Sequence, residues 1–140
     1  MYKYKATILR VVDGDTVDVD IDLGFDVWLR KQRIRLAGID TPESRTKDDR
    51  EKYYGKLAKN FLKTLLVEGE TYELETTEKG KFGRYLGTFT NAIIGDVCDK
   101  MVECQQAVRY HGQSKKDIEK EHKANWGALR ARGLGYVEPR

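Results

Sequence analysis

The sequence has few of the residues that hold small secreted proteins together. Its 140 residues include two cysteines, two prolines and two histidines. The cysteines, Cys98 and Cys104, are too few for a disulfide framework, and no histidine pair lies near them at the spacing of a zinc site. We therefore expect free thiols in a reducing compartment.

Long apolar runs are also absent. No run approaches the roughly 20 residues that span a bilayer, and residues 1–16 lack the apolar core and small-residue cleavage site of a signal peptide. We expect a cytoplasmic, monomeric protein with no membrane segment. A chain of this length predicts one domain over residues 1–140, in which residues 113–140 form a C-terminal helical extension.

Charge, by contrast, is abundant and unevenly placed. Charged residues make up 35% of the chain, with a formal net charge of +3. Residues 1–26 hold three basic and six acidic side chains, whereas residues 109–132 hold seven basic and three acidic ones. An acidic spot within a basic surround suits a metal site that faces a polyanion, although charge alone favours ordinary solvated surface.

The hydrophobic pattern predicts strands and helices in an order that identifies a fold class. Residues 17–23 alternate strictly between apolar and acidic, which is typical of a strand with one buried face. Strands are expected at residues 4–12, 17–23, 28–39, 72–76 and 85–90, helices at 54–65, 97–104 and 114–133, and a loop at 43–52. This order predicts an α+β, mainly β protein: a five-stranded OB-fold barrel with flanking α-helices.

Three aromatic residues and one histidine are expected to pack in the core or at its edge. Phe25, Trp28 and Tyr110 are expected in the core, with stacking on nucleic-acid bases as the alternative. His122 lies on the apolar stripe of the last helix, which indicates a partly packed core edge.

Four short motifs carry the oxygen ligands and positive charges that phosphodiester chemistry needs. They are DGDT at residues 13–16, Arg35, DTPE at residues 40–43, and FGR at residues 82–84. A hard cation prefers several oxygen ligands, and Asp15, Asp40 and the backbone carbonyl of Thr41 could supply them.

The remaining polar groups of these motifs suit the other parts of the reaction. Glu43 is a candidate to orient a water or take its proton. Arg35 and Arg84 can donate paired hydrogen bonds to the negative charge that develops on phosphorus.

The segments DGDTVDV, RIRLAGIDTPE and KFGRYLGTF, in this order, resemble the staphylococcal (micrococcal, thermonuclease-type) nuclease family over residues 4–110. The resemblance implies an OB-fold barrel and a Ca²⁺-dependent phosphodiesterase or endonuclease, with Mg²⁺ as the alternative cofactor. Its substrate would be DNA and/or RNA with little sequence preference, cut to leave 3′-phosphate ends. By position, the catalytic residues are Arg35, Glu43 and Arg84, and the metal-binding residues are Asp15, Asp40 and Thr41.

The resemblance also implies substrate contacts at Lys81, Phe82 and Tyr110. The family often has a tyrosine where this chain has Phe82, and a phenyl ring can stack but cannot donate a hydrogen bond. The alternative function is a catalytically silent nucleic-acid- or protein-binding module of the same family. A binding-only relative should have lost some of the six metal and catalytic residues, and this chain keeps all of them.

The five aspartates between residues 13 and 22 are expected to do two jobs. Asp15 is assigned to the metal, and Asp13 shapes the turn that presents it. Asp18, Asp20 and Asp22 share the solvated face of an alternating strand.

Overall fold

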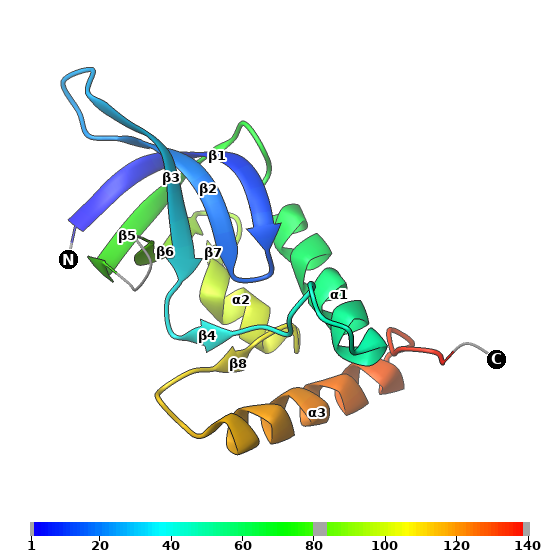
Figure 1. Ribbon diagram of the computed structural model, residues 1–140. Helices are drawn as coiled ribbons and strands as arrows, with labels where there is room; N and C mark the ends of the chain where they lie inside the picture. The colour runs from blue at the N-terminus through cyan, green and yellow to red at the C-terminus, as the bar shows by residue number, and fades with distance from the viewer. Residues whose placement is uncertain (1, 80–83, 139–140) are drawn as a thin grey trace.

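The computed structural model describes residues 2–79 and 84–138 (Figure 1). The elements, in chain order, are β1 (Tyr2–Asp13), β2 (Thr16–Asp22), β3 (Trp28–Leu36), β4 (Ile39–Asp40), α1 (Asp49–Leu65), β5 (Thr71–Lys79), β6 (Tyr85–Asn91), β7 (Gly95–Asp96), α2 (Val97–Glu103), β8 (Val108–Arg109) and α3 (Lys115–Ala131). Within these ranges, no helix has both the length and the apolar character needed to cross a membrane.

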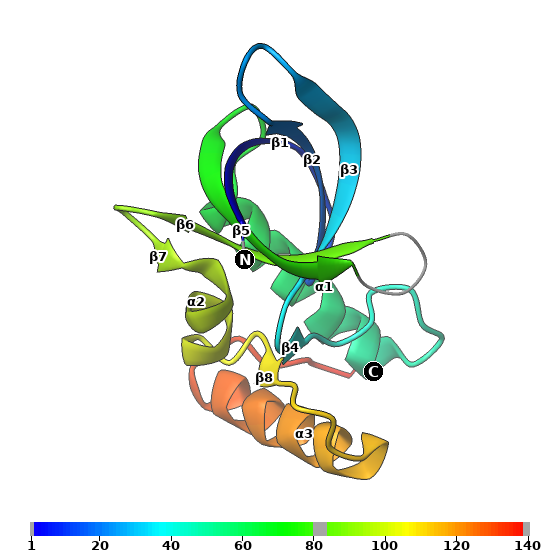
Figure 2. The ribbon, with the colours of Figure 1, turned by 90° about the vertical axis from the view of Figure 1, so that its left-hand side faces the viewer.

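Five of the strands close into a barrel. The sheet order is β3-β2-β1-β5-β6-β7, and a further pairing of β3 with β6 joins the two sides. This closing pair is parallel and runs from Ile34 opposite Tyr85 to Leu36 opposite Gly87. Figure 2 shows the strands curving around one interior. The predicted five-stranded, mainly β barrel with flanking helices is confirmed.

The core follows from the alternation of the strands. In β2, Val17, Val19 and Ile21 are buried inside the barrel, because successive side chains of a strand point to opposite faces. Asp18 and Asp20 lie on the outer face, where they pair with Arg33 at 2.9 Å and Arg30 at 3.1 Å. The predicted solvated face is therefore present, and arginines of the neighbouring strand neutralise its charge.

The helix α1 begins earlier than the sequence predicts. Residues 49–52 were expected in a loop, but they form its first turn. The Asp48 carboxylate accepts hydrogen bonds from the backbone N–H groups of Arg50 and Glu51, at 3.0 and 3.2 Å. An aspartate in this position satisfies amides that the helix leaves unpaired, so the charged segment can continue the helix toward its N-terminus.

The prediction that Phe25, Trp28 and Tyr110 belong to the core is wrong. Phe25 is fully exposed at the tip of the β2–β3 hairpin, which projects beyond the barrel (Figure 1). Trp28 is partly exposed, and the Arg30 guanidinium lies 4.7 Å from its ring centre. A hairpin that extends past its sheet has no second layer to cover these rings.

Both cysteines are free thiols, as expected.

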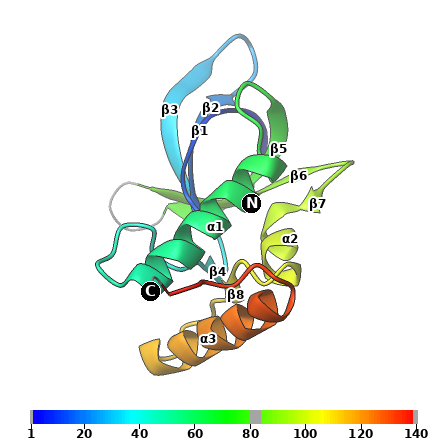
Figure 3. The same cartoon turned by 90° about the vertical axis from the view of Figure 1, so that its right-hand side faces the viewer.

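The chain after α3 turns back beside α3 and reaches the N-terminal end of α1, as Figure 3 shows. The Tyr53 hydroxyl donates to the backbone carbonyl of Leu134 at 2.9 Å, and the backbone N–H of Tyr136 donates to the Tyr54 hydroxyl at 3.0 Å. These bonds tie the end of the chain to the first turns of α1.

Close packing at Gly55 fixes the segment that follows β4. A Cβ atom added to Gly55 would lie 2.4 Å from the backbone oxygen of Glu43 and 2.6 Å from the backbone nitrogen of Ser44. Only a residue without a side chain lets α1 approach this segment so closely.

Replacing Gly55 with alanine should therefore destabilise the fold. We expect Gly55→Ala to lower the free energy of unfolding by about 1–3 kcal/mol, because overpacking outweighs the better helix propensity of alanine. The matched control is Gly127→Ala in α3, where nothing lies within 4 Å of an added Cβ, and this variant should gain up to about 1 kcal/mol. Urea denaturation measures both, and equal stabilisation of the two variants would contradict the packing argument.

Candidate functional site

The turn between β1 and β2 presents Asp15 to the interior of the molecule. The carboxylate of Asp13 accepts a hydrogen bond from the Gly14 backbone N–H at 3.0 Å, which confirms its predicted role in shaping the turn. A Cβ atom on Gly14 would lie 3.0 Å from the Ala58 side chain and 3.1 Å from Thr41 Oγ1. The turn is thus held between α1 and the segment after β4.

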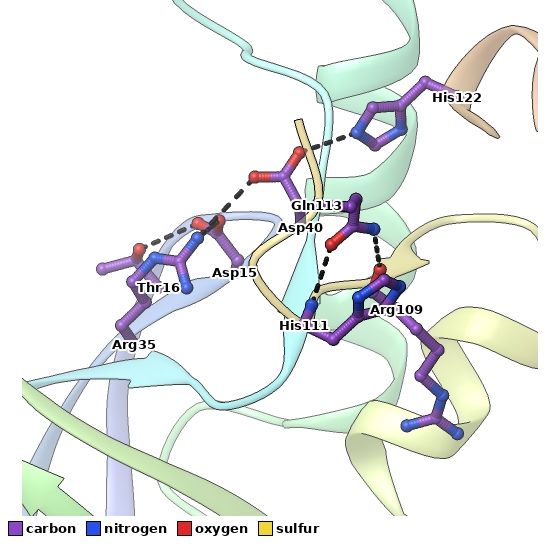
Figure 4. A network of polar contacts seen from close by, with 8 residues as sticks. All are labelled: Asp15, Thr16, Arg35, Asp40, Arg109, His111, Gln113 and His122. Atoms are coloured by element: carbon purple, nitrogen blue, oxygen red, sulfur yellow. Dashed lines mark hydrogen bonds and ion pairs between the residues drawn. The ribbon is translucent and has the colours of Figure 1, made fainter. Parts of the chain in front are cut away.

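Arg35 joins two of the predicted metal-binding acids. Its Nη2 lies 3.4 Å from Asp15 Oδ2 and 3.7 Å from Asp40 Oδ1 (Figure 4). The backbone fixes this arrangement, since Arg35 pairs with Thr16 across β2 and β3, and the Leu36 N–H donates to the Asp15 carbonyl at 2.8 Å. Asp15 and Asp40, which are 25 positions apart in the sequence, therefore meet at one guanidinium.

Asp40 is held from a second direction. It lies in the short strand β4, where it pairs with Val108 of β8. Its Oδ2 lies 2.7 Å from Nε2 of His122, a buried residue of α3 (Figure 4). One carboxylate oxygen therefore faces Arg35 and the other faces the last helix.

A groove of about 1080 Å³ opens from these residues along α3 and the start of α1. Its walls include Arg35, Asp40, Thr41, Glu43, Tyr110 and His122. The groove therefore brings together five of the sequence-predicted site residues. The rest of its lining carries more acidic than basic side chains, so an approaching phosphate would meet negative charge unless a cation offsets it.

Tyr110 enters the groove on a loop that Gln113 holds in place. The Gln113 side chain accepts a hydrogen bond from the His111 N–H at 2.8 Å and donates to the Arg109 carbonyl at 2.7 Å (Figure 4). The Tyr110 N–H donates to the Gly38 carbonyl at 2.8 Å. With 46% of its surface exposed, the Tyr110 ring is available for stacking, the alternative that the sequence left open.

Arg84 lies at the start of β6, beside the part of β3 that carries Arg35. The parallel register pairs Ile34 with Tyr85 and Arg35 with Leu86, so Arg84 directly precedes the paired segment and is half-buried. The predicted substrate contacts Lys81 and Phe82 lie outside the described residues.

Burial and neighbouring negative charges raise the pKa values of two carboxyl groups of the site, those of Asp15 and Glu43. Burial raises the pKa of Asp15 above its ordinary value, against the opposing effects of Arg35 and the Thr16 hydroxyl, and Asp13 and Asp40 raise it further. The pKa of Glu43 is raised by partial burial of its carboxyl and by nearby acids, of which Asp13 and Asp15 have the largest effects. The site therefore holds more negative charge than its own arginine neutralises.

The donor set fits a hard cation. Asp15 Oδ2 and Asp40 Oδ1 both lie within 4 Å of the same Arg35 nitrogen, and the backbone of the buried Thr41 follows Asp40 directly. Within residues 2–79 and 84–138, no group of three or more His, Cys, Asp and Glu side chains is arranged as a metal cluster. A cation here would thus use two carboxylates, a backbone carbonyl and water, which calcium accepts.

Two polar residues of this site were missed by the sequence interpretation. His122 is buried as expected, but its contact with Asp40 joins residues 82 positions apart, and no local pattern reports such a pairing. Gln113 lies in a polar stretch where nothing distinguishes a loop clamp from a solvated side chain.

The sequence is similar to one protein family and to several individual nucleases. The family model described as staphylococcal nuclease homologue matches residues 33–132. The chain is 40% identical over 80 residues to the thermonuclease of Staphylococcus intermedius, and 36% identical over 80 residues to that of Staphylococcus hyicus; each match covers 56% of this chain and 44% of the relative. It is 33% identical over 86 residues to the micrococcal nuclease of Shigella flexneri, covering 60% of this chain and 41% of the relative. The chain thus spans less than half the length of these relatives.

The raised pKa of Asp15 predicts how stability depends on pH. The folded state binds the Asp15 proton more tightly than the unfolded chain, so stability falls as pH rises from about 4, the ordinary carboxyl value, through the raised pKa. In the presence of a chelator, Asp15→Asn should be more stable than wild type at pH 7, and this difference should shrink toward pH 3. Urea denaturation across this pH range tests it, and lower stability of Asp15→Asn at pH 7 would show that the ion pair with Arg35 outweighs burial.

Proposed function

Because the chain belongs to the staphylococcal nuclease homologue family, we propose that it is a metal-dependent nuclease. It would hydrolyse phosphodiester bonds of DNA and/or RNA with little sequence preference and leave 3′-phosphate ends. The observation that supports this proposal most is the meeting of Asp15, Arg35 and Asp40 at the end of a groove that also contains Glu43.

Asp15, Asp40 and the Thr41 carbonyl would hold the cation, with Ca²⁺ favoured over Mg²⁺. Calcium tolerates irregular oxygen ligands, whereas magnesium demands a near-octahedral set. When bound, the cation would supply positive charge against the substrate phosphate. The unneutralised charge around Asp15 favours such binding, since the cation would offset the repulsion among Asp13, Asp15 and Asp40.

Arg35 and Arg84 would act on the phosphate. With a cation held by the two carboxylates, the Arg35 guanidinium would be free to donate to a non-bridging phosphate oxygen, and Arg84 would donate from the residue just before the neighbouring strand β6. Both guanidinium groups stay charged at any working pH. They would stabilise the five-coordinate transition state more than the ground state, because its oxygens carry more negative charge.

Glu43 would take the proton of the attacking water. Its raised pKa lies nearer to neutral pH than that of an ordinary glutamate, which improves it as a base. The water oxygen bonds to phosphorus, the bond from phosphorus to the 5′-oxygen breaks, and the leaving oxygen takes up a proton. The phosphate stays on the 3′ side. Tyr110 would contribute a stacking surface for a base beside the reacting phosphate.

One assay separates this function from a silent binding module. The purified chain is incubated with single-stranded DNA, duplex DNA or RNA, each with Ca²⁺, Mg²⁺ or chelator. We expect cleavage with Ca²⁺ and none with chelator. Binding of nucleic acid without cleavage under every condition would favour the silent module on the same barrel.

Replacing the proposed base should reduce the rate without unfolding the protein. Glu43→Gln removes the proton acceptor but keeps the shape of the side chain, so we expect kcat to fall by about 100-fold or more. The matched control is Glu68→Gln, an equivalent change at an exposed glutamate in the turn after α1, which should leave the rate unchanged. Initial rates on single-stranded DNA measure both, and near-native activity of Glu43→Gln would assign the proton transfer to another group.

A further inference from the structure

The last helix supplies a side chain to the cation site. His122 of α3 reaches Asp40 of β4 with its Nε2 atom 2.7 Å from Oδ2 (Figure 4). Only 7% of the His122 surface is exposed, so the contact is shielded from water. When the Asp40 carboxylate is ionised it can only accept hydrogen bonds, so the His122 Nε2 atom is then the donor of this contact.

This contact determines which oxygen of Asp40 faces the cation position. With Oδ2 held by His122, Oδ1 lies on the side of Arg35, 3.7 Å from its Nη2. The same nitrogen lies 3.4 Å from Asp15 Oδ2. One oxygen from each carboxylate is thus held near the same point.

Without His122, Asp40 would lose this orientation. The terminal torsion of an aspartate is broad and has two nearly equivalent settings. A carboxylate freed at Oδ2 could turn both oxygens toward the Arg35 fork, which binds carboxylates in paired geometry. An oxygen engaged in that way would be withdrawn from a cation.

The imidazole is itself held by a stack of aromatic rings. Its centre lies 6.4 Å from that of Trp126, with 26° between the planes. Trp126 stacks in turn on Tyr54 of α1, at 4.7 Å and 7°. Packing that spans two helices therefore fixes the ring plane of His122. A well-oriented hydrogen bond to the carboxylate of Asp40 requires such a fixed ring.

We propose that His122 is a positioning residue that orients the Asp40 carboxylate for cation binding and makes α3 part of the active site. This role rests on the proposed function, since it concerns the cation that the nuclease would use. Hydrogen bonds to a metal-binding carboxylate typically contribute 10-fold to 100-fold to metal affinity. The role predicts an effect on cation affinity that exceeds any effect on folding.

Three variants of the whole chain test this role. His122→Ala removes the donor, and His122→Gln keeps an N–H that can occupy the place of Nε2. Asn125→Ala is the matched control, because Asn125 anchors the same helix by donating its side-chain hydrogen bond to the Ala107 carbonyl at 3.2 Å. Isothermal titration calorimetry measures the Ca²⁺ affinity of each variant, and thermal denaturation measures its stability.

We expect His122→Ala to weaken Ca²⁺ binding by at least about 10-fold, and His122→Gln to recover most of that loss. Asn125→Ala should lower the melting temperature but keep the wild-type affinity. In cleavage assays, His122→Ala should need more Ca²⁺ for half-maximal rate. Saturating Ca²⁺ should restore its rate toward wild type, because the groups that act on the phosphate are unchanged.

Other outcomes would overturn the role in distinguishable ways. Wild-type affinity in His122→Ala, or an equal loss of affinity in Asn125→Ala, would reduce His122 to a structural residue and leave the nuclease function in place. A wild-type protein that neither binds Ca²⁺ nor cleaves nucleic acid would overturn both the proposed function and the role of His122.

Discussion

The candidate site depends on one guanidinium held between two carboxylates. Arg35 faces both Asp15 and Asp40, and the three residues come from β3, the β1–β2 turn and the short strand β4. The register of β2 against β3 places Arg35 next to the turn that carries Asp15. The pairing of β4 with β8 brings Asp40 to the same point. Without the arginine, two partly buried acids would repel each other and would have to take up protons.

Arg35 does not fully neutralise the negative charge of this region. Burial and neighbouring acids raise the pKa of Asp15 despite the ion pair. Under the proposed function, a bound cation would offset the charge of these carboxylates and leave the Arg35 guanidinium free for a phosphate. Partial burial raises the pKa of Glu43, and neighbouring acids, chiefly Asp13 and Asp15, raise it further. The proposed cation binding and proton transfer would therefore depend on the same cluster of charges as stability does.

Packing between helices and loops keeps this cluster in place. Gly55 lets α1 lie directly against the backbone of Glu43 and Ser44, and Gln113 closes the loop that carries Tyr110. The stacked rings of Tyr54 and Trp126 connect α1 with α3, next to His122. Helices α1 and α3 thus do more than cover the barrel, since both contribute residues to the wall of the groove.

Alternation and short motifs were enough to predict the barrel strands and to single out the candidate site residues, because both are local signals. It also indicated that His122 is buried, but its partner Asp40 is 82 positions away, and periodicity reports burial without naming a partner. Phe25 was predicted to lie in the core but is exposed. An apolar residue is buried only where another layer of the structure covers it, and the local sequence does not report whether such a layer is present. The tertiary structure was needed to show the partner of His122 and the exposure of Phe25. Both depend on which distant segments of the chain meet when the barrel closes.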